Sequence, residues 1–233
     1  MFLPCKTPIE AVHYSAGRSG VNRLIVFLPG IGDLAEDFEA AGLICAAMST
    51  ELVADAIAVD AHFGYYARRS VVDRLAHDVV LPARRRGYRE IWLVGISMGG
   101  AGALAYTAHH PAHVERVLLL APYLGEAKRI QAIIDEPCLQ TDKMVARSEV
   151  DPMHDVWRWM VRPDAHDVLT KLYLGYGIRD RFATANALLG ARLPATHVRS
   201  LPGGHDWRTW KRLWDAFVAA WTKECSSEGM PSS

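Results

Sequence analysis

Short apolar runs alternate with longer amphipathic segments along most of the chain. The apolar runs predict buried β-strands at 23–30, 53–60, 90–95, 115–123, 167–177 and 196–204. Apolar residues at helical spacing predict helices at 34–48, 71–87, 99–110, 181–192 and 206–224, with Pro82 expected to kink or break the second. Strands that are apolar on both faces and alternate with helices are typical of a covered parallel sheet. The pattern therefore predicts an α/β fold, a doubly wound and mostly parallel sheet flanked by helices.

One stretch interrupts this alternation, from about 125 to 167. It includes the sequence DPMHDVWRWMVRPD and favours two or three short helices without a convincing strand. In a doubly wound sheet such an insertion lies beyond the carboxyl ends of the strands, where ligands bind. We therefore expect residues 1–233 to form a single domain with a short helical lid at about 125–167.

Composition and charge narrow the range of partners. The chain has 233 residues, half of them hydrophobic, with 26 basic and 26 acidic side chains, so no net charge favours nucleic acid or an anionic membrane. The uncharged run 91–108 contains too many glycines for a membrane span, and the first residues lack the pattern of a signal peptide. The cysteines of the chain lie far apart in the sequence; they are Cys5, Cys45, Cys138 and Cys225. This spacing predicts free thiols and a cytoplasmic protein.

A serine stands between two glycines where the strand at 90–95 meets the helix at 99–110. The residues Gly95-Ile96-Ser97-Met98-Gly99 match G-x-S-x-G, in the strand-turn-helix context that this motif requires. A tight turn of this kind leaves no room for side chains two positions before and after the serine. Ser97 is therefore a candidate nucleophile.

A second glycine-rich loop supports a competing interpretation. The sequence LPGIGDLA matches the dinucleotide fingerprint G-x-G-x-x-A through Gly30, Gly32 and Ala35, and Asp60 ends the next strand. However, Asp33 places a carboxylate where a pyrophosphate would bind, and we expect it to cap the following helix instead. Asp60 also lies later in the chain than a ribose-binding acid should. Dinucleotide binding remains a less favoured alternative.

A serine hydroxyl needs a base to take its proton and an acid to orient that base. His205, in the turn LPGGHDW after the last predicted strand, is the candidate base. Asp180, directly after the strand that ends in LYLGYG, is the candidate acid. Asp164 and Asp167 precede that strand, and Asp206 adjoins the histidine, so all three are less suitable.

Acyl transfer also needs hydrogen-bond donors for the oxyanion of the tetrahedral intermediate. The turn supplies one, the backbone N–H of Met98. The loop PGIGD supplies the other, for which we expect the N–H of Ile31, with Gly30 or Gly32 as alternatives.

By these elements the chain resembles the α/β-hydrolase superfamily from about Arg23 to Trp221, and GISMGGAGAL and PGGHDWRTW are similar to the small serine esterases of the esterase D and carboxylesterase kind. The resemblance implies Ser97 as nucleophile, His205 as base and Asp180 as acid, an ester or thioester substrate, and no cofactor. One departure is Pro29-Gly30 where these esterases have His-Gly. A non-catalytic or acyl-transferring member of the same fold is the main alternative to a hydrolase.

Several further residues are candidates for substrate contact because they follow predicted strands or lie in the lid: His62, Tyr123 and Trp157, with Phe63, Tyr65, Tyr66 and Trp159 as neighbours that could serve the same role. The sequence HHPAH (residues 109–113) could suggest a metal site, but a proline interrupts it and histidines suit a helix C-terminus. We therefore expect no metal. The sequence does not indicate an oligomeric state.

Overall fold

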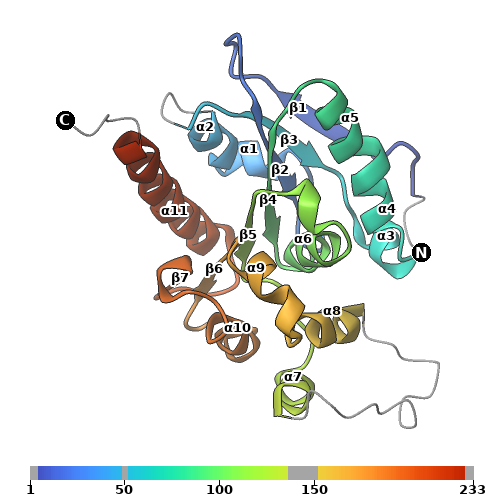
Figure 1. The fold of residues 1–233 in the computed structure, drawn as a ribbon, viewed down its shortest axis with the longest axis vertical. Helices are drawn as coiled ribbons and strands as arrows, with labels where there is room; N and C mark the ends of the chain where they lie inside the picture. The colour runs from blue at the N-terminus through green and yellow to red at the C-terminus, as the bar shows by residue number, and fades with distance from the viewer. Residues whose placement is uncertain (1–4, 49–51, 136–151, 229–233) are drawn as a thin grey trace.

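In the computed structural model, which describes residues 5–48, 52–135 and 152–228, seven strands form one sheet in the order β1-β3-β2-β4-β5-β6-β7 (Figure 1). The strands are β1 Ala11–Tyr14, β2 Arg23–Leu28, β3 Asp55–Val59, β4 Glu90–Ile96, β5 Arg116–Leu120, β6 Leu172–Gly177 and β7 Val198–Leu201. All neighbouring strands are parallel except β1, which pairs antiparallel with β3. The predicted α/β fold with a mostly parallel sheet is confirmed.

Helices cover both faces of the sheet. They are α1 Asp37–Ala40, α2 Leu43–Ala47, α3 Phe63–Ala67, α4 Val71–Arg74, α5 Leu81–Arg85, α6 Met98–His109, α7 Ala127–Asp135, α8 Pro152–Met160, α9 His166–Leu169, α10 Ala183–Gly190 and α11 Trp207–Glu228. The π-helical segment Leu75–Val80 and three short 3₁₀ turns, Pro111–His113, Pro163–Ala165 and Ala195–His197, complete the described helical segments.

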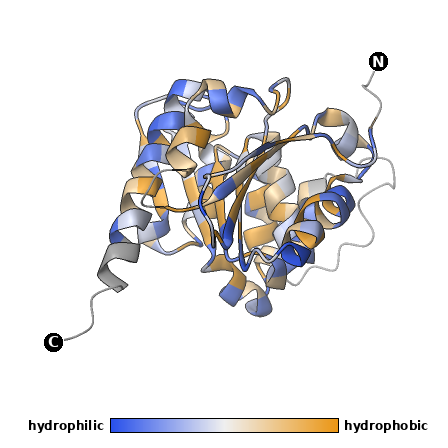
Figure 2. Cartoon of the chain, turned by 90° about the horizontal axis from the view of Figure 1, so that it is seen from above, coloured by the Kyte–Doolittle hydropathy of each residue, from blue (hydrophilic) through white to orange (hydrophobic). Residues whose placement is uncertain are grey.

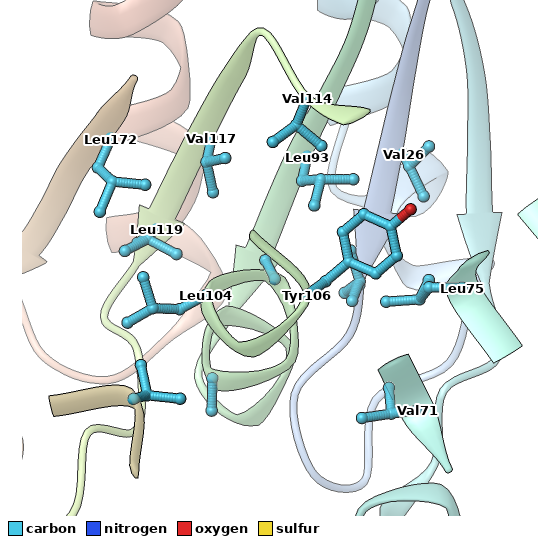
Figure 3. Packing of buried hydrophobic residues seen from close by; sticks show 14 of the residues in the cluster. Val26, Val71, Leu75, Leu93, Leu104, Tyr106, Val114, Val117, Leu119 and Leu172 are labelled. Atoms are coloured by element: carbon cyan, nitrogen blue, oxygen red, sulfur yellow. The ribbon is translucent and has the colours of Figure 1, made fainter. Parts of the chain in front are cut away.

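Each face of the sheet has its own hydrophobic core. On one face, α6 packs Leu104 and Tyr106 among the side chains of β4, β5 and Leu75 (Figure 3). On the other face, α11 packs Trp214 and Phe217 together with residues of α1 and α2. Figure 2 shows the same division, with hydrophobic residues along the strands and hydrophilic ones on the outer helix surfaces. Burial on both faces explains why the strands read as continuous apolar runs.

The strand order reverses between β2 and β4. The chain runs from β2 outward to β3, then returns to pair β4 on the other side of β2, with Leu28 opposite Gly95. Ligands of doubly wound sheets bind at such a switch point, beyond the carboxyl ends of the strands. The loops that follow β2 and β4 are those that carry PGIGD and Ser97.

The boundaries differ from the sequence prediction in several places. Strand β1 was not predicted, because it is only four residues long and half exposed at the sheet edge. The single helix expected at 34–48 is divided into α1 and α2 by Gly42, which has a φ of +76°. Helix α3 was also not predicted, and the strand expected from Asp167 starts only at Leu172, after α9.

The helix predicted at 71–87 is continuous in spite of Pro82. Residues Leu75–Val80 form π-helical turns between α4 and α5. Proline has no N–H to donate to the carbonyl four residues earlier, and a wider turn accommodates this gap. The proline therefore coincides with a change of helix type rather than a break.

Candidate active site

Ser97 lies in the turn between β4 and α6 with a strained backbone. Its φ of 53° and ψ of −114° are unusual for a residue with a side chain. A Cβ on Gly95 would lie 2.6 Å from the Cα of Gly100, and one on Gly99 would lie 2.6 Å from the carbonyl oxygen of Pro29. Both glycines are therefore required by close packing, Gly95 against the turn itself and Gly99 against the loop after β2.

Backbone hydrogen bonds hold this turn against β5. The N–H of Ser97 donates to the carbonyl of Leu120 at 3.0 Å, and the N–H of Tyr123 donates to the carbonyl of Ser97 at 2.8 Å. The strained residue is thus fixed from both sides by the neighbouring strand and its loop. Its side chain is buried except for 7% of the residue surface.

The structure brings Ser97, His205 and Asp180 together in one hydrogen-bonded chain. Nε2 of His205 lies 3.0 Å from Oγ of Ser97, and Nδ1 lies 2.8 Å from Oδ2 of Asp180. An ionised carboxylate only accepts, so Nδ1–H donates to Asp180 and Nε2 is left to accept from the serine hydroxyl. The Asp180 side chain has no exposed surface, while 13% of the His205 side chain is exposed.

Neighbouring groups fix the acid and the base. Oδ1 of Asp180 accepts the backbone N–H of Phe182 at 2.8 Å. The N–H of Arg179 donates to the carbonyl of Gly203 at 3.0 Å and ties the acid loop to the histidine loop. The imidazole meets the rings of Phe182 and Trp210 edge to face, with centroids 5.1 and 5.0 Å away. These two aromatic contacts were missed by the sequence interpretation, which gave neither Phe182 nor Trp210 a place in the site.

The loop after β2 lies directly beside Ser97. A Cβ on Gly30 would lie 3.4 Å from the Cβ of Ser97. The next residue, Ile31, is exposed over 59% of its surface. Met98 is the first residue of α6, and the first N–H groups of a helix have no acceptor within the helix. Both expected oxyanion donors thus lie on segments next to the serine.

Asp33 has a different role from the helix cap that the sequence suggested. Helix α1 starts only at Asp37, whose own carboxylate accepts the N–H of Leu34 at 2.7 Å. Asp33 instead accepts the indole N–H of Trp207, at the start of α11, at 3.1 Å. Burial raises the pKa of the Asp33 carboxyl, an effect that the Trp207 hydrogen bond partly offsets. A half-buried carboxylate therefore joins the loop after β2 to the C-terminal helix.

The three residues expected to contact substrate have different positions. Tyr123 lines a cavity next to Met98, and its ring packs against Phe182. His62 caps α3, where its Nδ1 accepts the N–H of Gly64 at 3.1 Å. Trp157 is 1% exposed and donates its indole N–H to the carbonyl of Leu124, so it belongs to the hydrophobic core. In the lid segment it is Trp159, not Trp157, that faces the cavity.

The remaining candidate features are structural in the described part of the chain. His113 hydrogen-bonds to the hydroxyl of Tyr106 and stacks on His110. Among the described residues, no group of three or more histidine, cysteine or acidic side chains is arranged to hold a metal ion. Cys5 and Cys45 are free thiols, whereas Cys138 and the side chain of Cys225 lie outside the described residues. Within the ranges described, no helix has both the length and the apolar character needed to cross a membrane.

Comparison with known families identifies one match. The model of the Esterase family, described as "Putative esterase", matches residues 62–219, which is more than half of the chain. The matched range includes Ser97, Asp180 and His205. None of the curated protein sequences matches at a significant level.

Several solved structures have the same fold as this chain. Est1E from Butyrivibrio proteoclasticus, in a structure with ferulic acid bound, has a TM-score of 0.59 at 16% identity, with 98% of each chain covered. The S-formylglutathione hydrolase FrmB from Staphylococcus aureus has a TM-score of 0.59 at 15% identity, covering 87% of this chain and 81% of the other. MPT51 from Mycobacterium tuberculosis has a TM-score of 0.56 at 15% identity, covering 93% and 98%. At these identities the likeness shows the α/β-hydrolase fold.

Proposed function

This chain belongs to the esterase family of α/β-hydrolases and is an ester-cleaving hydrolase, and on that premise we propose that Ser97, His205 and Asp180 cleave a carboxylic ester or thioester through an acyl-enzyme intermediate. The observation that carries the proposal is the chain of hydrogen bonds from Asp180 through His205 to Ser97, at 2.8 and 3.0 Å. A nucleophile within reach of its base, and a base oriented by a buried acid, is the geometry that activated serines require.

In the first half of the reaction, Nε2 of His205 takes the proton of the Ser97 hydroxyl while Oγ attacks the carbonyl carbon. The imidazolium that forms is stabilised by the carboxylate of Asp180, whose side chain is fully buried. His205 then gives the proton to the leaving alcohol or thiol as the bond to the acyl carbon breaks. The acyl group remains attached to Oγ of Ser97.

In the second half, water takes the place of the leaving group. His205 removes a proton from the water as the water oxygen attacks the acyl carbon, and then returns that proton to Oγ of Ser97 as the bond between Oγ and the acyl carbon breaks. The products are the carboxylic acid and the free enzyme. No cofactor enters either half of this scheme.

The negative oxygen of both tetrahedral intermediates is held by the backbone N–H groups of Ile31 and Met98. Support comes from the contact between the Gly30 region and Ser97, and from the place of Met98 at the first position of α6. Each donor of this kind contributes roughly a hundredfold to a thousandfold in turnover. Tyr123 contacts the acyl group of the substrate. The helices of the 125–167 insertion act as a lid over the site, and the chain forms a single domain.

The proposal is tested by Ser97→Ala assayed on an activated acetate ester. Loss of the nucleophile lowers turnover by roughly 10⁴- to 10⁶-fold. Ser200→Ala is the matched control, because Ser200 is an exposed serine on β7 and keeps wild-type turnover. Unchanged activity of Ser97→Ala excludes the proposed mechanism.

A fluorophosphonate probe provides a second readout that does not depend on the choice of ester. We expect mass spectrometry of the labelled wild-type protein to locate the phosphonate on Ser97, and Ser200→Ala to label at the same rate. Failure of the folded wild-type protein to label favours the non-catalytic alternative.

A further inference from the structure

A large cavity starts beside the proposed oxyanion donor and leads away along α6. It has a volume of about 940 Å³ and is lined by residues of α3, α4, α6, α7 and α8, and by Tyr123. Both α4 and α8 contact α6, and residues of all three helices line the cavity. We call this space the α6 groove.

The floor of the α6 groove is a face of small residues on α6. Met98, Ala101, Gly102, Ala105 and Ala108 all line it, at the three- and four-residue spacing of one helix face. The alanines keep this face low, whereas the ring of Tyr66 from α3 packs directly on Gly102. The walls are apolar as well, with Val71 and Val72 from α4 and Met153, Val156 and Trp159 from α8.

The position of the α6 groove relative to His205 indicates which part of an ester it takes. The leaving oxygen must receive its proton from His205 and therefore lies on the histidine side of the acyl carbon. The lining elements of the α6 groove are those that follow β3, β4 and β5, whereas His205 follows β7 at the sheet edge. The acyl chain, and not the alcohol, is thus directed into the groove.

The apolar part of the α6 groove has a defined length. From Met98 to Ala105, α6 rises about 10 Å at 1.5 Å per residue, the length of an extended chain of about eight carbons. One turn beyond Ala105, α6 contributes His109 to the lining, which also includes the charged residues Arg69, Asp73, Glu126, Arg129 and Asp155. A longer chain would bring its methyl end among charged groups and gain little from binding there.

From these observations we propose that the α6 groove is the acyl-chain site of this enzyme and selects medium-length acyl esters of about eight carbons. The proposal rests on the proposed function of Ser97. Each methylene buried in the groove raises kcat/KM up to about fourfold, so the value climbs from acetyl to octanoyl esters and levels off for longer chains.

The test measures kcat/KM for p-nitrophenyl esters from acetyl to dodecanoyl, in the wild type and in Ala105→Trp. The indole fills the far end of the apolar part of the groove, and the ratio of octanoyl to acetyl kcat/KM falls at least tenfold. Ala108→Trp closes it one turn further out, so this variant lowers the value for dodecanoyl esters much more than for octanoyl esters. Together the two variants show which acyl chain length reaches position 105 and which reaches position 108. Ala108→Trp remains informative if Ala105→Trp does not fold.

Ala187→Trp is the matched control, because Ala187 is an exposed alanine in α10; its octanoyl-to-acetyl ratio stays at the wild-type value. A parallel series of acetate esters with lengthening alcohols shows whether the groove takes the other half of the ester, and a shift there in Ala105→Trp overturns the acyl assignment. A flat acyl profile in an active wild type overturns the groove proposal while leaving Ser97 in place. Absence of all ester turnover contradicts the proposed function itself.

Discussion

Contact with His205 distinguishes Asp180 from the three other aspartates that the sequence offered as possible acids. Asp180 contacts the imidazole at 2.8 Å, and its side chain is fully buried. Asp164 instead pairs with Arg162 at 2.8 Å on the surface, and Asp206 accepts the N–H of Thr209 at the start of α11. Asp167 lies in α9, ahead of β6. Position after a strand of the parallel sheet, rather than nearness to the histidine in sequence, distinguishes Asp180.

We therefore expect Asp180→Asn to lower turnover on an activated ester by roughly 10³- to 10⁴-fold. The amide keeps the shape of the side chain but can donate to Nδ1, which stabilises the wrong tautomer and no longer stabilises the imidazolium. Steady-state kinetics measure the effect, and Asp164→Asn serves as the control with turnover within about twofold of the wild type. A large loss in Asp164→Asn together with normal turnover in Asp180→Asn would show that Asp164, and not Asp180, is the acid.

The turn between β4 and α6 depends on its contact with the loop after β2. A Cβ at position 99 would meet the backbone carbonyls of both Leu28 and Pro29, which belong to β2 and its loop. Backbone cannot move aside as a flexible side chain can. The glycine thus sets the distance between the two segments that carry Ser97 and the proposed oxyanion donor Ile31.

Gly99→Ala is accordingly expected to destabilise the protein by about 1–3 kcal/mol, the usual cost of overpacking. It should also lower kcat more than it raises KM, since the separation of the nucleophile and the oxyanion donors matters most in the transition state. Urea unfolding and steady-state kinetics measure the two effects. Gly190→Ala near the end of α10, where the nearest atom would be a side-chain methyl of Val198 at 3.3 Å, should leave kcat unchanged.

The elements that carry the site were predictable because β2, β4 and β6 are buried on both faces and end in loops of distinct composition. β4 and β6 are buried over nearly their whole length. Their carboxyl ends meet at one edge of a parallel sheet, so Ser97 and Asp180 could be paired with a histidine by chain order alone. The roles of these residues remain predictions, whereas the fold is confirmed.

Other features depend on packing that no local pattern records. The orientation of α8 decides that Trp157 is buried and that Trp159 faces the α6 groove, and this follows from the surface on which α8 packs. Strand β1 has too few residues for an alternating pattern to be recognised. The contact of Asp33 with Trp207 joins residues 174 positions apart, and neither neighbouring sequence indicates the other.

The site as a whole is assembled from loops after β2, β4, β6 and β7. The loop after β2 and the loop before α11 must therefore keep a fixed position relative to each other. The Asp33–Trp207 hydrogen bond is one link between them, since it ties the loop after β2 to the first residue of α11. The indole of Trp207 also packs against Phe38 in α1 and against Trp210, whose ring flanks His205. A change at Trp207 therefore reaches both the proposed oxyanion loop and the base.

A double-mutant cycle with Trp207→Phe and Asp33→Asn measures this link. Trp207→Phe keeps an aromatic ring but leaves the half-buried Asp33 carboxylate without the indole donor, which costs about 1–3 kcal/mol. Asp33→Asn removes the charge, so the double variant should recover part of that loss and give a coupling energy of roughly 0.5–3 kcal/mol. Additive effects would show that the two residues act independently.

The pH dependence of the stability of Trp207→Phe tests separately whether its destabilisation comes from the lost hydrogen bond to Asp33. Burial raises the pKa of Asp33 in the folded state, so the folded protein favours the neutral carboxyl, and removal of the Trp207 donor raises that pKa further. A raised folded-state pKa means that stability is lost as pH rises from the unfolded-state pKa through the folded-state pKa. The destabilisation by Trp207→Phe should therefore be larger at pH 7 than near pH 4, and should show no such dependence in the Asp33→Asn background. Urea unfolding at the two pH values measures it, and an equal loss at both would assign the effect of Trp207→Phe to lost ring packing alone.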